Sequence, residues 1–382
     1  MSSSSSKRLL ALDVLRGITI AGMITVNNPG SWSHIYAPLQ HAEWNGCTPT
    51  DLVFPFFMFV MGVAMYISWQ KTDFRLTGRA LWKLFYRGTL LILIGWAIAT
   101  YGIMLRGLTG GGTLADVWDK IIHHLRFPGV LPRLGIVSML GGFCLLAAKP
   151  KRILWVAGAL LILYCLIIGL TDSFYLSPDN IVSRIDVAVF GENHLYHKGG
   201  IAFDPEGLLS TIPCIGHCLL GAYAGGLIMR TENKWEKVNG LFIFGSIVLL
   251  SGFLLDYAFP INKSLWSASY VLVTCGLASL LLALLIWIID IRGYRRWAVF
   301  FESFGANPLF IFVLSGFFAI TLSAVKIPWE DGQISLWGFW YNVCMMPLFG
   351  EKGGSLACAL SLVVVLWLIA HPLYRKKIYI KL

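Results

Sequence analysis

Charged side chains are scarce in this sequence. Only 13% of its 382 residues are Asp, Glu, Lys or Arg, whereas soluble domains carry about 25%. No stretch is polar and long enough to form a separate soluble domain, so we treat residues 1–382 as a single domain. This scarcity excludes an ordinary soluble protein, because such a protein has far more polar surface to supply.

The common nucleotide-binding and hydrolase motifs are also missing. The sequence has no P-loop, no dinucleotide-binding fingerprint and no Gly-x-Ser-x-Gly elbow. Its eight cysteines and its histidines form no set of pairs at zinc-like spacing, so we expect no metal site, and we predict no disulfide. The formal net charge of +10 is not accompanied by a nucleic-acid-binding motif, and we expect no nucleic-acid partner.

Long apolar runs are what the sequence has instead. A membrane-spanning helix needs about 20 predominantly apolar residues, and runs of this length recur along the whole chain. The sequence therefore predicts an all-α, polytopic helical bundle in a membrane, with about ten transmembrane helices. We place them at residues 9–29, 50–70, 84–106, 129–148, 152–171, 207–229, 238–258, 268–290, 297–322 and 353–374.

Basic residues are distributed unevenly between the two sets of connecting segments. Most of the 30 Lys and Arg residues lie near the chain ends and in alternate connections, as Lys71, Arg79 and Arg152 do. Because cytoplasmic loops are enriched in Lys and Arg, we predict that both termini are cytoplasmic and that the loop carrying His41 faces outward. The same basic face attracts anionic membrane lipid.

The segment 41–55 brings a titratable side chain to the edge of an apolar span. It reads His-Ala-Glu-Trp-Asn-Gly-Cys-Thr-Pro-Thr-Asp-Leu-Val-Phe-Pro. The preceding apolar segment ends at Val26-Asn27-Asn28-Pro29-Gly30 and leads into the same loop. Ionisable groups are costly near hydrocarbon and need partners, so the His41 imidazole is a candidate functional group. Asp51 has two interpretations: it caps the helix that follows, or it orients His41.

Short motifs recur in order along nearly the whole chain. They are Leu12-Asp13-Val14-Leu15-Arg16-Gly17, Val26-Asn27, His41-Ala42-x-Trp44-Asn45-Gly46-x-Thr48, Asp51-Leu52-Val53-Phe54-Pro55, Pro128-Gly129-Val130-Leu131-x-Arg133-Leu134-Gly135, Asp204-Pro205-Glu206-Gly207, Asn262-Lys263-x-Leu265-Trp266-Ser267-x-Ser269-Tyr270 and Lys376-Lys377-Ile378. This ordered set resembles the heparan-α-glucosaminide N-acetyltransferase family. The resemblance implies a membrane enzyme that takes an acetyl group from acetyl-CoA on the cytoplasmic side. It would transfer that group to the amine of a terminal glucosamine on the outer side.

The resemblance also implies a role for His41. An amine that attacks a thioester must lose a proton, and imidazole titrates in a suitable range to act as general base. Alternatively, the imidazole attacks the thioester and carries the acetyl group itself. Asn27 and Asn45 are candidate amide donors to the oxyanion of the tetrahedral intermediate. The sequence leaves direct transfer and the ping-pong route open.

Candidate contacts to CoA lie inside or near the ends of spans. Arg16 and Arg133 are within predicted spans, where an unpaired guanidinium is costly. Each is either part of an internal ion pair, with Asp13 the nearest partner for Arg16, or a contact to the phosphates of CoA. His371, near the inner end of the last span, is a further candidate for CoA binding.

Candidate contacts to the sugar lie in the outward segments. Trp44 either anchors the chain at the membrane interface or offers a face on which a sugar stacks. Asp204 and Glu206 either bind the sugar or cap a helix. We expect an amino-sugar or glycan acceptor and membrane lipid as partners. The sequence leaves open whether the protein forms a homodimer.

Two other functions stay open beside this one. The first is an O-acetyltransferase that modifies a hydroxyl of a surface glycan. The second is a sugar transporter, in which charges within the membrane line the substrate route. The compact form and the predicted topology are typical of a prokaryotic protein, so we expect a bacterial inner membrane as its location.

Overall fold

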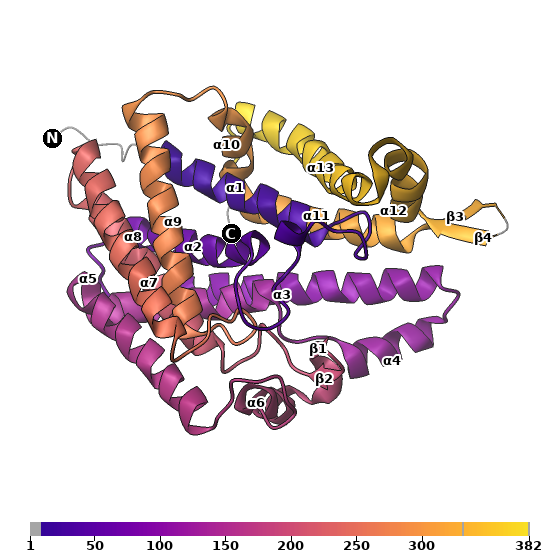
Figure 1. The fold of residues 1–382 in the computed structure, drawn as a ribbon, viewed down its shortest axis with the longest axis horizontal. Helices are drawn as coiled ribbons and strands as arrows, with labels where there is room; N and C mark the ends of the chain where they lie inside the picture. The colour runs from indigo at the N-terminus through magenta and orange to yellow at the C-terminus, as the bar shows by residue number, and fades with distance from the viewer. Residues whose placement is uncertain (1–8, 331, 381–382) are drawn as a thin grey trace.

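Helices make up almost all of the structure, a computed structural model that describes residues 9–330 and 332–380 (Figure 1). The main helices are α1 (Leu10–Asn27), α2 (Val53–Gln70), α3 (Gly78–Thr109), α4 (Leu114–His124), α5 (Val130–Leu170), α6 (Ile181–Phe190), α7 (Thr211–Met229), α8 (Lys234–Asp256), α9 (Ala268–Leu285), α10 (Ala298–Ala306), α11 (Pro308–Ala324) and α13 (Met346–Arg375). The short elements are η1 (Ala37–Leu39), η2 (Pro49–Leu52), η3 (Glu192–His194), η4 (Ile286–Ile291), α12 (Leu336–Phe339), η5 (Trp340–Met345) and two small antiparallel hairpins, β1 (His197–Lys198) with β2 (Ile201–Ala202) and β3 (Lys326–Trp329) with β4 (Gly332–Ser335). The predicted all-α class is confirmed.

The count of spans differs from the sequence-based expectation of about ten. Within the described ranges, eight helices are long and apolar enough to cross a membrane. Helices α10 and α11 meet at 86° and form a ninth span if they are counted together. The difference lies in α5, which runs through two of the predicted spans, 129–148 and 152–171.

A break divides α5 between those two predicted spans. Its 41 residues would measure ~60 Å as one straight helix, about twice the hydrocarbon thickness of a bilayer. The backbone of Lys149 is not helical, with φ 60° and ψ 162°, and Pro150 follows it. Proline has no N–H to donate and disfavours the helical conformation of the residue before it. Each half of α5 therefore has the length of one predicted span.

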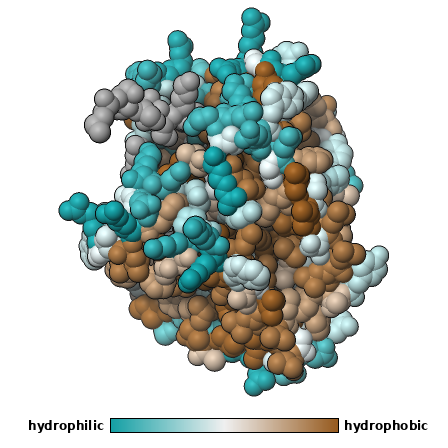
Figure 2. Space-filling view, turned by 90° about the vertical axis from the view of Figure 1, so that its left-hand side faces the viewer, coloured by the Kyte–Doolittle hydropathy of each residue, from teal (hydrophilic) through white to brown (hydrophobic). Residues whose placement is uncertain are grey.

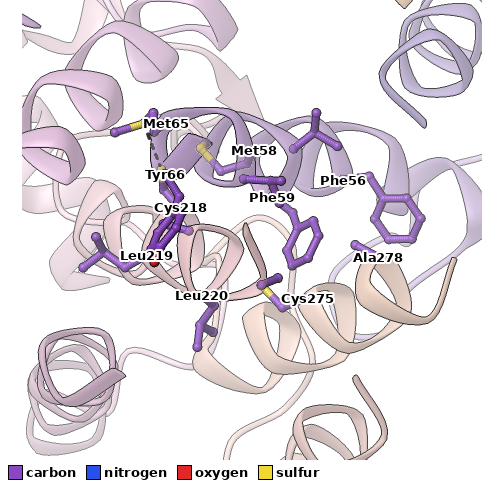
Figure 3. Packing of buried hydrophobic residues seen from close by; sticks show 14 of the residues in the cluster. Phe56, Met58, Phe59, Met65, Tyr66, Cys218, Leu219, Leu220, Cys275 and Ala278 are labelled. Carbon is purple, nitrogen blue, oxygen red and sulfur yellow. Dashed lines mark hydrogen bonds between the residues drawn. The ribbon is translucent and has the colours of Figure 1, made fainter. Parts of the chain in front are cut away.

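The best-buried part of the bundle lies where α2, α7 and α9 pack together (Figure 3). Met58 and Phe59 of α2 point toward Leu220 of α7 and Cys275 of α9. Glycine lets α2 and α7 approach closely, because a Cβ added at Gly62 would lie 2.0 Å from the carbonyl oxygen of Cys218. Close approach through small residues is the usual way for helices to pack within a membrane.

The outer surface of the bundle is apolar over large areas. Leu170, Leu254 and Ile162 expose 85%, 73% and 62% of their surfaces. Figure 2 shows one side of the molecule, where hydrophilic side chains gather toward the top and left and apolar side chains cover the lower and right-hand parts. Helices with all backbone groups paired and apolar side chains outside are what a bilayer requires. This is an integral membrane protein.

Three segments that connect helices meet at one end of the bundle, which we call the His41 end. They are residues 28–52, 171–210 and 257–267. Trp44 donates a hydrogen bond to the carbonyl of Phe174 at 2.7 Å, which joins the first segment to the second. Gly46 donates to the carbonyl of Ile261 at 2.7 Å, which joins the first segment to the third. The His41 loop is thus held from two sides.

Candidate active site

The start of α2 fixes the carboxylate of Asp51. Thr48 is the N-cap of η2, which leads directly into α2, and it forms a capping box with Asp51. Asp51 Oδ2 accepts hydrogen bonds from the backbone N–H of Thr48 at 3.1 Å and from its hydroxyl at 3.0 Å. The backbone N–H of Ala42 donates to the same oxygen at 3.0 Å. The phenol of Tyr270 on α9 donates to the backbone carbonyl of Asp51 at 2.6 Å. Together these bonds hold the backbone and the carboxylate of Asp51 in a defined position.

His41 lies directly against that carboxylate. Its Nδ1 is 2.7 Å from Asp51 Oδ1. The Asp51 side chain is only 1% exposed, whereas the His41 side chain is 45% exposed. The two interpretations of Asp51, as a helix cap and as the partner of His41, therefore describe one side chain that makes both sets of contacts.

Lys263 completes what we call the His41 cluster, which consists of His41, Asp51 and Lys263. The Lys263 ammonium lies 3.2 Å from Asp51 Oδ1 and 3.0 Å from His41 Nδ1. Our reading of the sequence missed this residue as part of the site. The signal was present, because Lys263 belongs to one of the motifs that carry the family resemblance, but it is more than 200 positions from His41 in the chain.

The polar surroundings of the cluster are mostly basic. Lys198 on β1 donates to Ser264 at 2.7 Å and lies 5.2 Å from the centre of the Trp44 ring. Burial and the neighbouring Lys263 lower the pKa of Lys198. Burial and the nearby Asp51 carboxylate raise the pKa of the Cys47 thiol to about 12, so this thiol stays neutral.

Asn45 connects the His41 loop to the segment that carries Lys263. Its Oδ1 accepts a hydrogen bond from the Asn262 amide at 3.1 Å. Gly46 next to it forms a backbone bridge with Asn262 and has φ of +107°, a conformation that favours glycine. The Asn45 Nδ2 group makes no hydrogen bond within the described residues, so it remains able to donate to a ligand.

Trp44 is half-buried and has contacts on both its edge and its face. Its indole N–H binds the Phe174 carbonyl, and its ring packs edge-on against Phe203 at 5.2 Å. Asn27 is exposed in the last turn of α1, and its side chain makes no hydrogen bond to His41 in the part of the chain that the structure describes. His41 and Asp51 are thus in direct contact, Asn45 is joined through Asn262 to the segment that carries Lys263, and no hydrogen bond among the described residues joins Asn27 to them.

Asp204 and Glu206, predicted to bind the sugar, are engaged by an arginine. Arg126 donates to both oxygens of Asp204, at 2.8 and 2.6 Å, and to Glu206 at 2.5 Å. Asp204 is fully buried and also accepts from the backbone N–H groups of Tyr196 and Glu206. These contacts give the two carboxylates a structural role, and sugar binding by them stays a prediction.

Arg133 is buried at the His41 end of the bundle, in the first turn of α5. Its guanidinium donates to the carbonyl of Gly207 at 2.8 Å and to the hydroxyl of Ser210. The indole ring of Trp266 lies 5.4 Å from it. The side chain is 1% exposed, so the structure offers it no open route to a CoA phosphate.

Arg16 and His371 lie at the opposite end and meet on α10. Arg16 forms the predicted ion pair with Asp13 at 3.0 Å and also approaches the Gly305 carbonyl at 3.4 Å. His371 Nδ1 is 3.1 Å from the hydroxyl of Ser303, two residues before Gly305. Two of the three predicted CoA-binding residues therefore share a neighbourhood, and Arg133 is separated from them.

One cavity of about 220 Å³ lies between α3, the start of α5 and α11. Arg106, Arg126 and Phe312 are among its lining residues. Neither the His41 cluster nor the residues predicted to bind CoA contribute to this lining.

The candidate active site is the His41 cluster. A buried carboxylate holds Nδ1 of its imidazole, and Nε2 makes no hydrogen bond within the described residues.

Comparison with known proteins gives two relatives of the same name. The chain is 30% identical over 446 residues to heparan-alpha-glucosaminide N-acetyltransferase of Homo sapiens, an alignment that covers 100% of this chain and 61% of the relative. It is also 30% identical over 370 residues to the protein of that name from Mus musculus, which covers 81% of this chain and 53% of the relative. The chain thus spans between about half and three fifths of the length of these relatives. No family model matches it. The chain belongs to the heparan-α-glucosaminide N-acetyltransferase family.

Proposed function

We propose that this protein is a membrane acetyltransferase that moves the acetyl group of acetyl-CoA to the amine of a glucosamine-type sugar. The observation that carries the proposal is the buried Asp51 carboxylate held against the His41 imidazole at the edge of an apolar span. Both relatives are named for N-acetyl transfer to a glucosaminide, and the motifs around His41 are part of the family resemblance. Acetyl-CoA is the co-substrate.

In the direct route, the sugar amine attacks the thioester carbonyl while His41 acts as general base. The C–N bond forms, the C–S bond breaks, and CoA leaves as its thiolate. The amine proton moves to His41 Nε2 and from there to solvent. The Asp51 carboxylate accepts from Nδ1, so it fixes the ring orientation and stabilises the imidazolium that forms.

In the alternative route, His41 carries the acetyl group. Nε2 attacks the thioester and forms an acetyl-imidazole as the CoA thiolate leaves. The sugar amine then attacks this carbonyl, the C–N bond to the imidazole breaks, and the ring is released with the amine proton going to solvent. Both routes use the same exposed nitrogen and the same buried carboxylate.

Amide groups and an aromatic ring would complete the acceptor side. The free Nδ2 of Asn45 is a donor to the oxyanion of the tetrahedral intermediate, and Asn27 is a second candidate from the end of α1. The half-buried ring of Trp44 offers a surface for the sugar beside them. The positions of Trp44 and Asn45 in the loop that holds His41, and of Asn27 at the end of the helix that leads into this loop, support these assignments.

The donor would reach the site from the opposite end of the bundle. We propose that this end faces the cytoplasm, that the His41 end faces outward and that the protein lies in a bacterial inner membrane. The basic residues near α10 and the meeting of Arg16 and His371 on that helix favour the donor nucleotide there. Guanidinium and imidazolium groups suit phosphate.

Acetyl transfer by the purified protein tests the proposal. Protein in detergent is incubated with isotopically labelled acetyl-CoA and a panel of glucosamine-bearing and hydroxyl-only sugars, and products are identified by mass. We expect label on the glucosamine amine. Label on hydroxyl groups alone would establish the O-acetyltransferase in its place, and no transfer to any acceptor together with no CoA binding would favour a transporter.

A further inference from the structure

Two groups with opposite hydrogen-bonding demands lie at the same nitrogen of His41. Asp51 Oδ1, at 2.7 Å from Nδ1, can only accept when ionised, whereas the Lys263 ammonium, at 3.0 Å, can only donate. One ring nitrogen cannot donate and accept at once. The 3.2 Å contact between Lys263 and Asp51 Oδ1 resolves the conflict, because the ammonium can donate to the carboxylate instead.

We infer that Lys263 is a positioning residue that, by pairing with Asp51, keeps His41 as the neutral tautomer with its proton on Nδ1. The lone pair is then on Nε2, the nitrogen that both proposed routes require. This inference rests on the proposed function for its consequence in catalysis. The effect of Lys263 on the charge state of His41 does not depend on the proposed function.

The backbone around Lys263 is built to hold the ammonium in place. Asn262 before it is fully buried and accepts from the N–H of Leu265 at 2.8 Å, while its own N–H donates to Ser267 at 3.0 Å. Trp266 is 1% exposed and has φ of 53°, a strained conformation for a non-glycine residue that persists only where the surroundings enforce it. The ammonium therefore does not depend on a flexible loop for its position.

The charges that face His41 come from three different segments. Asp51 on η2 is negative, Lys263 in the segment 257–267 is positive, and Lys198 on β1 interacts electrostatically with both. Glu43 is exposed in the same loop as His41, and the Cys47 thiol is neutral. A carboxylate alone would favour the imidazolium, and a paired ammonium cancels much of that effect. The Lys263 ammonium thus offsets part of the effect of the Asp51 charge on His41.

Replacement of Lys263 tests this in two independent measurements. The variants are Lys263→Met, which removes the charge at similar length, and Lys263→Arg, which keeps it. Lys326→Met is the matched control, because Lys326 is an exposed lysine on the β3–β4 hairpin, which protrudes from the bundle (Figure 1). Size-exclusion profiles and thermal midpoints establish that each variant is folded, and Lys263→Gln replaces Lys263→Met if the latter is not.

The first measurement is the pH dependence of acetyl transfer. The second is the pH dependence of the modification of His41 by diethyl pyrocarbonate, which reacts with neutral imidazole, followed by mass spectrometry of the His41 peptide. In both, Lys263→Met should move the acidic limb upward by about 1 pH unit, the effect of one charge about 3 Å away in a water-like medium. In Lys263→Arg, which keeps the charge, and in Lys326→Met, the acidic limb should lie at the same pH as in the parent protein.

The outcomes separate this inference from the proposed function. If the acidic limb stays in place in Lys263→Met in both measurements, the role given to Lys263 is wrong, and a loss of activity without a shift would show a merely structural role. If the parent protein transfers no acetyl group but Lys263→Met still shifts the pH profile of His41 modification, the proposed function fails and the role given to Lys263 stands.

Discussion

The two carboxylate oxygens of Asp51 make two different sets of contacts. One carboxylate oxygen accepts the backbone N–H groups of Ala42 and of Thr48, the N-cap of η2, and the other oxygen meets His41 and Lys263. The position of the His41 imidazole is therefore coupled to the start of α2, one of the best-buried helices. A substitution of Asp51 would disturb both the helix start and the imidazole, so its effect on activity alone would not identify a catalytic role.

Arg126 illustrates a different use of charge at the same end. Burial opposes the ionisation of Asp204, but Arg126 and the backbone N–H groups of Tyr196 and Glu206 outweigh it and hold the pKa of Asp204 below its usual value. A carboxyl whose pKa is lowered by folding stabilises the fold above the unfolded pKa, about 4, and this stabilisation is lost as the pH falls through the folded pKa.

We therefore predict that Arg126→Met lowers stability mainly at neutral pH. The loss should be about 2–3 kcal/mol at pH 7, at the low end for a broken buried pair because the Arg126 side chain is 36% exposed. Thermal midpoints in detergent from pH 3 to pH 7 measure it. The gap between variant and parent should narrow below about pH 4, and a gap that is constant over this range would contradict the ion-pair account.

At the scale of elements, the contact between α2 and α7 depends on the absence of side chains. A Cβ at Gly62 would lie 2.0 Å from the Cys218 carbonyl oxygen, and one at Gly221 would lie 2.3 Å from that of Phe59. Neither neighbour can turn away, because both are helix backbone. The approach of the two helices is thus set by two glycines that face each other's helix.

Gly62→Ala should accordingly destabilise the protein, and Gly158→Ala should not. A Cβ at Gly158, in α5, meets nothing within 4 Å, so this variant controls for the helix propensity of alanine. We expect Gly62→Ala to cost at least about 1–3 kcal/mol, the usual range for overpacking, and to lower the thermal midpoint. Equal midpoints for the two variants would show that α2 and α7 do not pack as described.

At the scale of the whole molecule, the arrangement of basic residues gives the bundle a direction. Among the described residues, the predicted cytoplasmic connections after α2, α7 and α9 follow the ends of these helices that lie opposite to the His41 end. This is the direction that the proposed acetyl transfer across the membrane needs. We predict that a fluorescent reporter which matures only in the cytoplasm is bright when fused after residue 382. Activity of a periplasm-dependent enzyme fused at that position would reverse the orientation and place the His41 end inside.

The sequence predicted the helical membrane class, because runs of apolar residues report directly on the bilayer. It predicted the loop of His41, Asn45 and Asp51 as one site, because these residues are close along the chain and their spacing fits a helix N-terminus. Asp13 was the nearest candidate partner for Arg16 along the chain, as one of two interpretations of this arginine, and the structure shows the ion pair between them.

Contacts that depend on folding could not be predicted in the same way. Lys263 meets His41 across 222 positions, and Arg126 meets Asp204 across 78. The burial of Arg133 follows from the packing of α5 against the segment before α7, which periodicity does not encode. The break in α5 at Lys149 was visible only as a Lys-Pro pair between two apolar runs, and the structure shows that helix continues on both sides of it.

Transfer across a sealed membrane tests the central claim most directly. The protein is reconstituted in vesicles with labelled acetyl-CoA on the side of the termini and glucosamine only on the other, and product is measured by mass. We predict acetylated amine on the glucosamine side for the parent and for His123→Ala, an exposed histidine on α4. The rate should fall at least about 10²-fold for His41→Ala, as expected on loss of a general base. Near-parental transfer by a folded His41→Ala protein, or product only when both substrates share one side, would contradict the account.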